Sequence, residues 1–98
     1  MKELIKKLTE VYGPSGHEER VREVIKEEIE TLADEVRVDL LGNLIALKRG
    51  GGDGVKAMLA AHMDEIGVIV THVDEKGFLR FAPIGGVIPH TLLGARVV

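Results

Sequence analysis

A histidine and an aspartate two residues apart are the side chains in this sequence best suited to chemistry. His62-Met63-Asp64 directly follows an apolar stretch, residues 55–61. Residues i and i+2 of an extended backbone point to the same side, so the imidazole and the carboxylate can converge. A carboxylate beside an imidazole fixes the ring tautomer and raises the basicity of the ring toward a metal ion. The spacing is therefore typical of a metal-binding histidine, His62, oriented by Asp64.

The same tripeptide is equally compatible with an ordinary strand end that carries a surface histidine and a surface aspartate. A catalytic zinc site takes about three protein ligands, and His62 alone is not a metal site. Its position after an apolar strand favours a functional role, because ligands of open α/β sheets bind outside the carboxyl ends of the strands. From the residues alone, both interpretations stay open.

The other polar candidates favour structural roles. Glu65 extends the acidic cluster and could support His62, but we expect a solvated carboxylate in a turn. We expect His17 in the first turn of a helix, His72 on a half-exposed strand and His90 in a loop.

Composition excludes several classes of function. A formal net charge of −3 and only three aromatic residues argue against nucleic-acid binding. The absence of cysteine excludes a disulfide scaffold, a thiolate zinc site and a cysteine nucleophile, and it fits a cytoplasmic location. Ser15 is the single serine, which argues against a serine triad. The longest apolar run, residues 66–70, is the size of a strand, so we expect no membrane partner.

Hydrophobic periodicity predicts two helices followed by strands. Apolar residues fall at helical spacing over residues 1–12 and 17–33, and Ser15 with Glu18 resembles a capping box for the second helix. Alternation predicts short strands around residues 36–38 and 44–48, joined by a turn at 41–43. The further expected strands are 55–61, 66–73 and 78–81, followed by an irregular segment, 82–90.

The predicted strand at residues 55–61 has no polar alternation, which suggests burial on both faces in the middle of an α/β sheet. Such a strand needs neighbours on both sides and helices on both faces. Two helices and few partner strands leave this core incomplete, although 98 residues suit a single domain. We expect Val97-Val98 to lie within a β-strand.

Several separate segments, in register, resemble the tetrahedral aminopeptidases. These are dinuclear metallo-exopeptidases that also include glutamyl and deblocking aminopeptidases. The resemblance covers essentially the whole chain and is carried by residues 13–18, 39–44, 60–67, 70–73 and 77–87.

The resemblance implies roles for two residues. His62 matches the first histidine ligand of one of two metal ions, and Asp64 matches the catalytic carboxylate that orients and polarises this histidine. In the family, a water or hydroxide bridging two zinc or cobalt ions attacks the carbonyl of the N-terminal residue. The remaining ligands and the glutamate base of the family match no residue here. The resemblance thus implies at most one partial site and an inactive isolated chain.

The resemblance also implies an α/β fold and a division of the chain. Residues 1–69 match the N-terminal part of a zinc-peptidase-like catalytic domain, and residues 70–98 match the truncated beginning of an inserted β-barrel domain. Because that insert serves in assembly, the expected partners are further copies of the chain or the remainder of the enzyme, with a peptide as substrate of full-length relatives.

Two other functions are considered. One is a non-catalytic oligomerisation or regulatory module derived from the same family, because an unfinished sheet exposes edges and apolar surface. The other is glycoside hydrolysis, which needs two carboxylates flanking a sugar site. No such pair stands out in the sequence.

Overall fold

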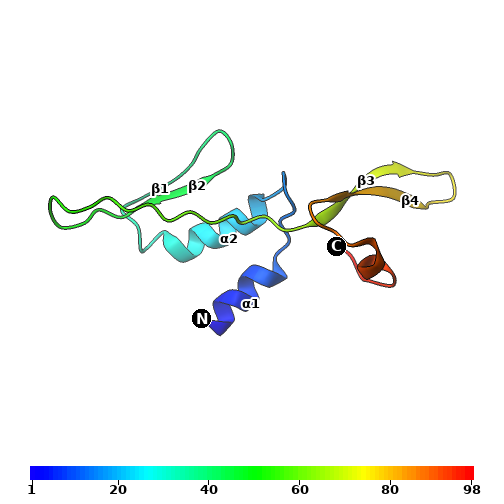
Figure 1. Ribbon diagram of the computed structural model, residues 1–98, viewed down its shortest axis with the longest axis horizontal. Coiled ribbons are helices and arrows are strands. Elements are labelled where there is room, and N and C mark those ends of the chain that lie inside the picture. Colours follow the sequence, from blue (N-terminus) through cyan, green and yellow to red (C-terminus); the bar gives the residue numbers. More distant parts are fainter.

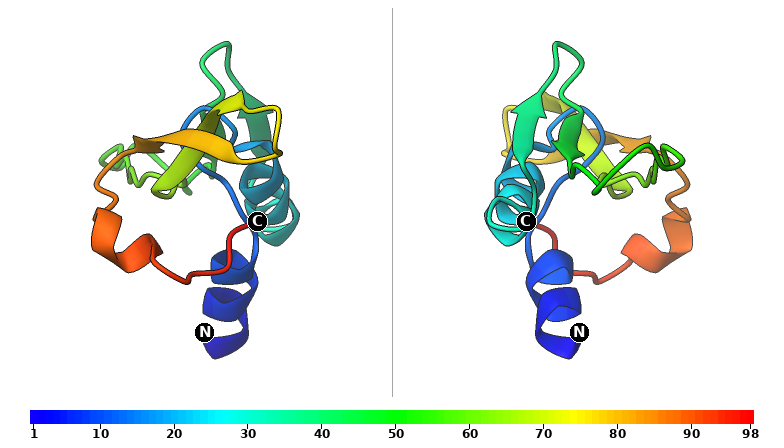
Figure 2. Two further views of the ribbon diagram at one scale, coloured as in Figure 1. Left: turned by 90° about the vertical axis from the view of Figure 1, so that its right-hand side faces the viewer. Right: turned by 90° about the vertical axis from the view of Figure 1, so that its left-hand side faces the viewer.

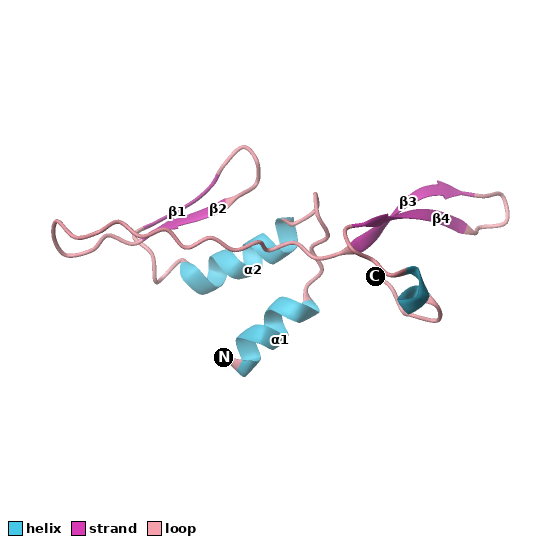
Figure 3. Cartoon of the chain, viewed as in Figure 1, coloured by secondary structure: helices cyan, strands magenta, loops and turns pink.

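The computed structural model describes the whole chain, Met1–Val98, as two helices followed by two separate β-hairpins (Figure 1). The helices are α1 (Lys2–Glu10) and α2 (Glu19–Ile29). The first hairpin pairs β1 (Glu35–Val38) with β2 (Leu44–Leu47), and the second pairs β3 (Gly67–Val73) with β4 (Leu79–Ile84). A short 3-10 helix, η1 (Pro89–Leu92), follows. The predicted order of two helices and then strands is confirmed (Figure 3).

The molecule is elongated and has almost no core. Its extents are 64 × 31 × 21 Å, and its radius of gyration is 17.9 Å, against about 13 Å for a compact domain of this length. Gly13 and Val21 are the two buried residues, and Val21 is 5% exposed. Neither helix combines the length and the apolar character needed to span a bilayer. After β4 the chain curves back toward the end of α1 (Figure 2).

Helices α1 and α2 form because their apolar residues recur at helical spacing, and they pack against each other. The Lys7 ammonium lies 2.9 Å from a carboxylate oxygen of Glu28 and 3.3 Å from one of Glu27. Lys7 donates a hydrogen bond to each carboxylate, and these bonds raise the pKa of Lys7, the one to Glu28 most. These ion pairs are exposed and add little stability.

The predicted capping box is wrong. Helix α2 begins at Glu19 with Glu18 as its N-cap residue, and no side chain caps its first turn. The Glu18 carboxylate instead accepts a hydrogen bond from the Gly16 backbone N–H. The Ser15 hydroxyl is not available to the helix because it is bonded to Asp64.

The predicted buried strand at residues 55–61 is also wrong. These residues form no strand, every one of them is exposed, and Leu59 is 98% exposed. Figure 1 shows this segment as an extended coil between the two hairpins. A strand exists only where a neighbour supplies hydrogen bonds, and each hairpin here pairs only with itself.

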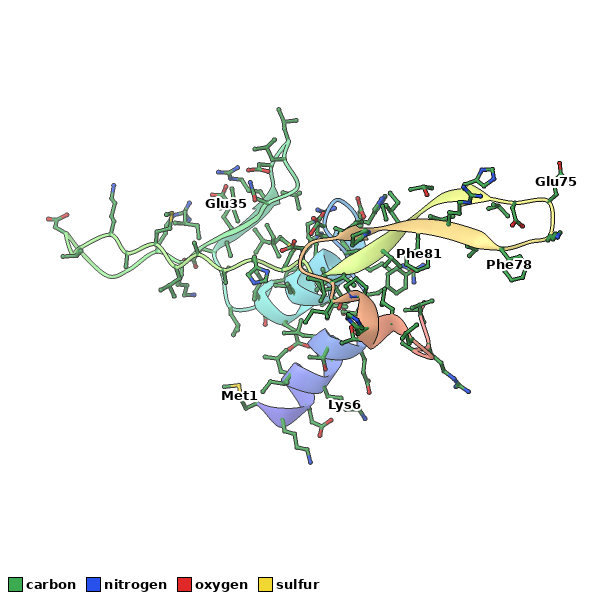
Figure 4. The ribbon with its side chains drawn as sticks, turned by 45° about the vertical axis from the view of Figure 1, so that its right-hand side comes forward. Met1, Lys6, Glu35, Glu75, Phe78 and Phe81 are labelled. Carbon is green, nitrogen blue, oxygen red and sulfur yellow. The ribbon has the colours of Figure 1, made fainter.

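The second hairpin is longer than the sequence predicts. Strand β4 continues through Pro83, opposite Val68, where we expected irregular chain. Proline is found in edge strands, and β4 is one, because it pairs only with β3. The turn at residues 74–77 is confirmed: the Asp74 carboxylate accepts from the backbone N–H groups of Lys76 and Phe78. Figure 4 shows Glu75 and Phe78 at the outer end of this hairpin.

The end of the chain also differs from expectation. Val97 and Val98 belong to no strand, because no other strand lies beside them to pair with. His90 lies in η1 rather than in an irregular loop.

The turn of the first hairpin is built around Asp39. Its carboxylate accepts hydrogen bonds from the backbone N–H groups of Leu41 and Asn43, both 2.9 Å, and from the Asn43 side-chain amide, 2.8 Å. Gly42 adopts a φ of +86°, which a left-handed turn residue requires. The predicted turn at residues 41–43 is confirmed.

These bonds make the turn sensitive to acid. The Asn43 side chain, followed by its backbone N–H, holds the pKa of Asp39 below its ordinary value of 3.8. The stabilisation is therefore present above pH 3.8 and is lost as the pH falls through the lowered pKa. In an NMR titration, we expect the Leu41 and Asn43 amide shifts to share a midpoint below 3.8.

The matched control for this titration is Asp53→Ala in the glycine-rich loop, which should leave both amide shifts unchanged. Asp39→Ala should abolish the transition. A midpoint at or above 3.8 would contradict the assignment.

Candidate metal-ligand site

The side chains of His62 and Asp64 converge as the spacing predicts. His62 Nδ1 lies 2.9 Å from Asp64 Oδ1 and 3.1 Å from the Asp64 carbonyl oxygen. With two oxygen acceptors beside it, Nδ1 carries the proton of the neutral ring, which leaves the lone pair of Nε2 free. The His62 side chain is 86% exposed. Its Nε2 is therefore accessible to a ligand.

Asp64 uses both carboxylate oxygens. Oδ1 faces His62, and Oδ2 accepts a hydrogen bond of 2.5 Å from the Ser15 hydroxyl. The bond from Ser15, followed by that from His62, lowers the pKa of Asp64. The carboxylate therefore stays ionised at neutral pH, as an acceptor for the His62 N–H must. Sequence reasoning missed Ser15, whose local spacing to Glu18 indicated a helix cap.

The loop between the helices is joined to the His62-Met63-Asp64-Glu65 segment by paired hydrogen bonds. The Gly13 N–H donates to Glu65 Oε1, and the Glu65 N–H donates to the Gly13 carbonyl, both at 3.0 Å. Pro14 and Glu65 also form an isolated parallel bridge. We call this set, with the Ser15–Asp64 bond, the loop–motif contact. Glu65 is thus an anchoring side chain and not simply a solvated one.

A small hollow of about 160 Å³ lies beside His62. It is lined by Glu18 at the start of α2, by the turn at Gly42 and Asn43, and by His62 and Asp64. Arg22 of α2 holds the turn in place by donating to the Gly42 carbonyl at 3.0 Å. Two elements distant in sequence therefore face the exposed imidazole.

A larger hollow of about 640 Å³ lies away from this chemistry. Its lining includes Tyr12, Arg20, Leu92 and Val98, but neither His62 nor Asp64. The Arg20 guanidinium sits 4.3 Å from the centroid of the Tyr12 ring, a cation–π contact on its wall. We therefore place the candidate site at the smaller hollow, where Asp64 orients the His62 side chain as a potential metal ligand.

The residues present fit one ligand position of a metal site. Nowhere in the chain do three or more histidine, aspartate or glutamate side chains gather so that they could hold a metal ion. The prediction of His17 in the first turn of a helix is wrong, because α2 begins only at Glu19. His72 lies on β3 and His90 on η1, so the histidines are dispersed over the fold. His62 is the histidine that a carboxylate orients.

Comparison with known proteins identifies the family. Residues 42–98 match the M42 glutamyl aminopeptidase family, and the chain belongs to it. A curated relative from Acetivibrio thermocellus is 57% identical over 97 residues, 99% of this chain. The lysyl aminopeptidase of Pyrococcus furiosus is 46% identical over 97% of this chain. The chain spans 29% and 27% of the length of these two relatives.

Solved structures share the fold. An aminopeptidase from the archaeon Desulfurococcus kamchatkensis superimposes with a TM-score of 0.87 at 44% identity, over 92% of this chain and 25% of that protein. A Thermotoga maritima protein described as an endoglucanase gives a TM-score of 0.83 at 47% identity, over 89% of this chain and 28% of that protein. The arrangement of helices and hairpins is therefore that of proteins in this family.

The loop–motif contact leaves no room for a side chain at Gly13. A Cβ atom there would lie 2.6 Å from Val21 Cγ1, and Val21 is itself buried. We expect Gly13→Ala to push the loop from α2 at a cost of about 1–3 kcal/mol, as is usual for overpacking, and so to open the Glu65–Gly13 hydrogen bond more often. Amide hydrogen exchange at Glu65 measures this loss.

Gly86→Ala is the control for this substitution, because a Cβ atom at Gly86 meets nothing within 4 Å. Equal exchange rates at Glu65 in the wild type and in Gly13→Ala would show that the packing against Val21 does not hold the loop.

Proposed function

We propose that this chain provides the first histidine ligand, His62, of a dinuclear metal centre that hydrolyses N-terminal residues from peptides. Asp64 is the carboxylate that orients this ligand. One observation carries the proposal: the 2.9 Å contact between His62 Nδ1 and Asp64 Oδ1, which leaves Nε2 exposed. Membership of the M42 family and the aminopeptidase names of its relatives support it.

Zinc and cobalt are the proposed metals, because imidazole nitrogen suits such divalent ions. When bound, the metal ions activate water and polarise the scissile carbonyl. The chain's own residues have a narrower role. Asp64 keeps the proton on Nδ1, and the turn at Gly42 and Asn43 limits the space beside the ring.

We further propose that residues 1–69 belong to the catalytic domain and that residues 70–98 begin a β-barrel insert used in assembly. The β3–β4 hairpin supports a separate unit in this part of the chain, because its two strands pair only with each other. Ile69 and Val70 on β3 and Phe81 on β4 are exposed apolar residues suited to a further partner. The proposed boundary falls within β3. A cytoplasmic location fits the absence of cysteine.

A non-catalytic assembly module of the same family is the second candidate. The exposed apolar segment at residues 55–61 favours it, because unpaired backbone and apolar side chains promote association. Sedimentation separates the candidates in part: a strictly monomeric, cooperatively folding chain argues against the assembly role.

Zinc titration tests the proposed ligand. In the chain labelled with ¹⁵N-histidine, we expect the Nε2 signal of His62 to respond at lower zinc concentration than those of His17, His72 and His90. The reason is that Asp64 orients His62 and raises its basicity. A response of His62 no earlier than the other three would contradict the assignment.

We expect the isolated 98-residue chain to be inactive, because one ligand cannot hold two catalytic metal ions and no residue here matches the glutamate base of the family. The measurement is hydrolysis of aminoacyl-p-nitroanilides with added zinc or cobalt, beside a His62→Ala control. Turnover that disappears in His62→Ala would disprove the expected inactivity.

A further inference from the structure

Ser15 makes the one side-chain contact to Asp64 that the proposed function does not use. The two residues are 49 positions apart, both are partly buried, and the Ser15 hydroxyl donates to Oδ2 at 2.5 Å. This length is typical of a hydroxyl bonded to an ionised carboxylate. The chain therefore contains a continuous series of hydrogen bonds, from Ser15 to Asp64 to His62.

A carboxylate held by one hydrogen bond can still rotate, because the terminal torsion of aspartate is broad. Rotation of Asp64 would move Oδ1 away from His62 Nδ1 and leave only the longer contact, 3.1 Å, to the Asp64 carbonyl oxygen. A second bond to the opposite oxygen fixes the plane of the carboxylate. Ser15 supplies that second bond.

The surrounding backbone fixes the place of Ser15. Two residues earlier, Gly13 is bonded to Glu65 in both directions. One residue later, Gly16 has a φ of +86° and donates its N–H to the Glu18 carboxylate. The hydroxyl is therefore presented to Asp64 by a loop anchored on both sides.

Helix α2 lacks a side-chain cap, and this supports a role for Ser15 at Asp64. A serine three residues before a glutamate would ordinarily cap the helix, worth about 1 kcal/mol, yet α2 has no side-chain cap. The hydroxyl that would suit the cap is bonded to Asp64 instead.

We propose that Ser15 is a positioning residue that acts through Asp64 to fix the tautomer and orientation of His62. The inference rests on the proposed function of His62 as a metal ligand, but its first test needs no metal. The exposed imidazole has no other protein group to orient it than Asp64.

The metal-free test is the tautomer of His62, read from its ¹⁵N chemical shifts in mildly alkaline solution. We expect the wild type to favour the form with the proton on Nδ1. Ser15→Ala should shift His62 toward the free-imidazole mixture, and Ser15→Thr, which keeps the hydroxyl, should restore the wild-type spectrum. An unchanged His62 spectrum in Ser15→Ala would overturn the proposal.

A second measurement tests whether Ser15 orients Asp64 or only stabilises the loop. Amide exchange at Glu65 reports the Gly13–Glu65 bonds, and we expect Ser15→Ala to leave it unchanged. Loss of that protection in Ser15→Ala, with no rescue of the tautomer by Ser15→Thr, would show a structural role only and overturn the proposal.

A zinc titration of the wild type and of Ser15→Ala is the third test. Loss of the group that orients a ligating histidine typically weakens metal binding by about 10–100-fold. Ser15 acts through that group, so Ser15→Ala should require up to about tenfold more zinc for the His62 response. If wild-type His62 does not respond to zinc while Ser15→Ala still alters the tautomer, the proposed metal function fails and the positioning role stands. If His62 responds equally in both proteins, the positioning role fails.

Discussion

The paired hydrogen bonds between Gly13 and Glu65 are the constraint on which the rest of this structure depends. Together with the bond from Ser15 to Asp64, they account for every hydrogen bond between residues 1–54 and residues 55–98. Helices and hairpins each satisfy their own backbone groups, so without this contact nothing polar would fix one half against the other. The loop that joins α1 to α2 is therefore the point from which the β3–β4 hairpin and the His62 imidazole take their positions.

The features that the sequence predicts correctly are those that depend on near neighbours. Helical spacing locates α1 and α2, alternation locates β1 and β2, and the i, i+2 rule brings His62 toward Asp64. The Asp39 turn belongs to the same group. Each is decided within a few residues, where periodicity and turn chemistry carry a signal.

The features that the sequence does not predict depend on distant partners. Residues 55–61 have the composition of a buried strand, but a strand needs hydrogen-bonded neighbours, and in this chain those are absent. Ser15 and Glu18 match a local capping pattern, yet a partner 49 residues away takes the serine hydroxyl. No residue near Glu65 in the sequence indicates its bond to Gly13. In such cases a distant residue and a local one compete for the same donor or acceptor, and the sequence does not show which of them binds it.

The span of the loop–motif contact has a consequence for the order of folding. Closing a loop of about 50 residues costs roughly (3/2)RT ln n, about 3.5 kcal/mol, and few buried groups offset it. Helices and hairpins form in microseconds from neighbouring residues. We therefore expect the helical pair and both hairpins to appear first. The bond from Ser15 to Asp64 and the hollow beside His62 would then be the last parts of the molecule to assemble, and the first to be lost when the chain begins to unfold.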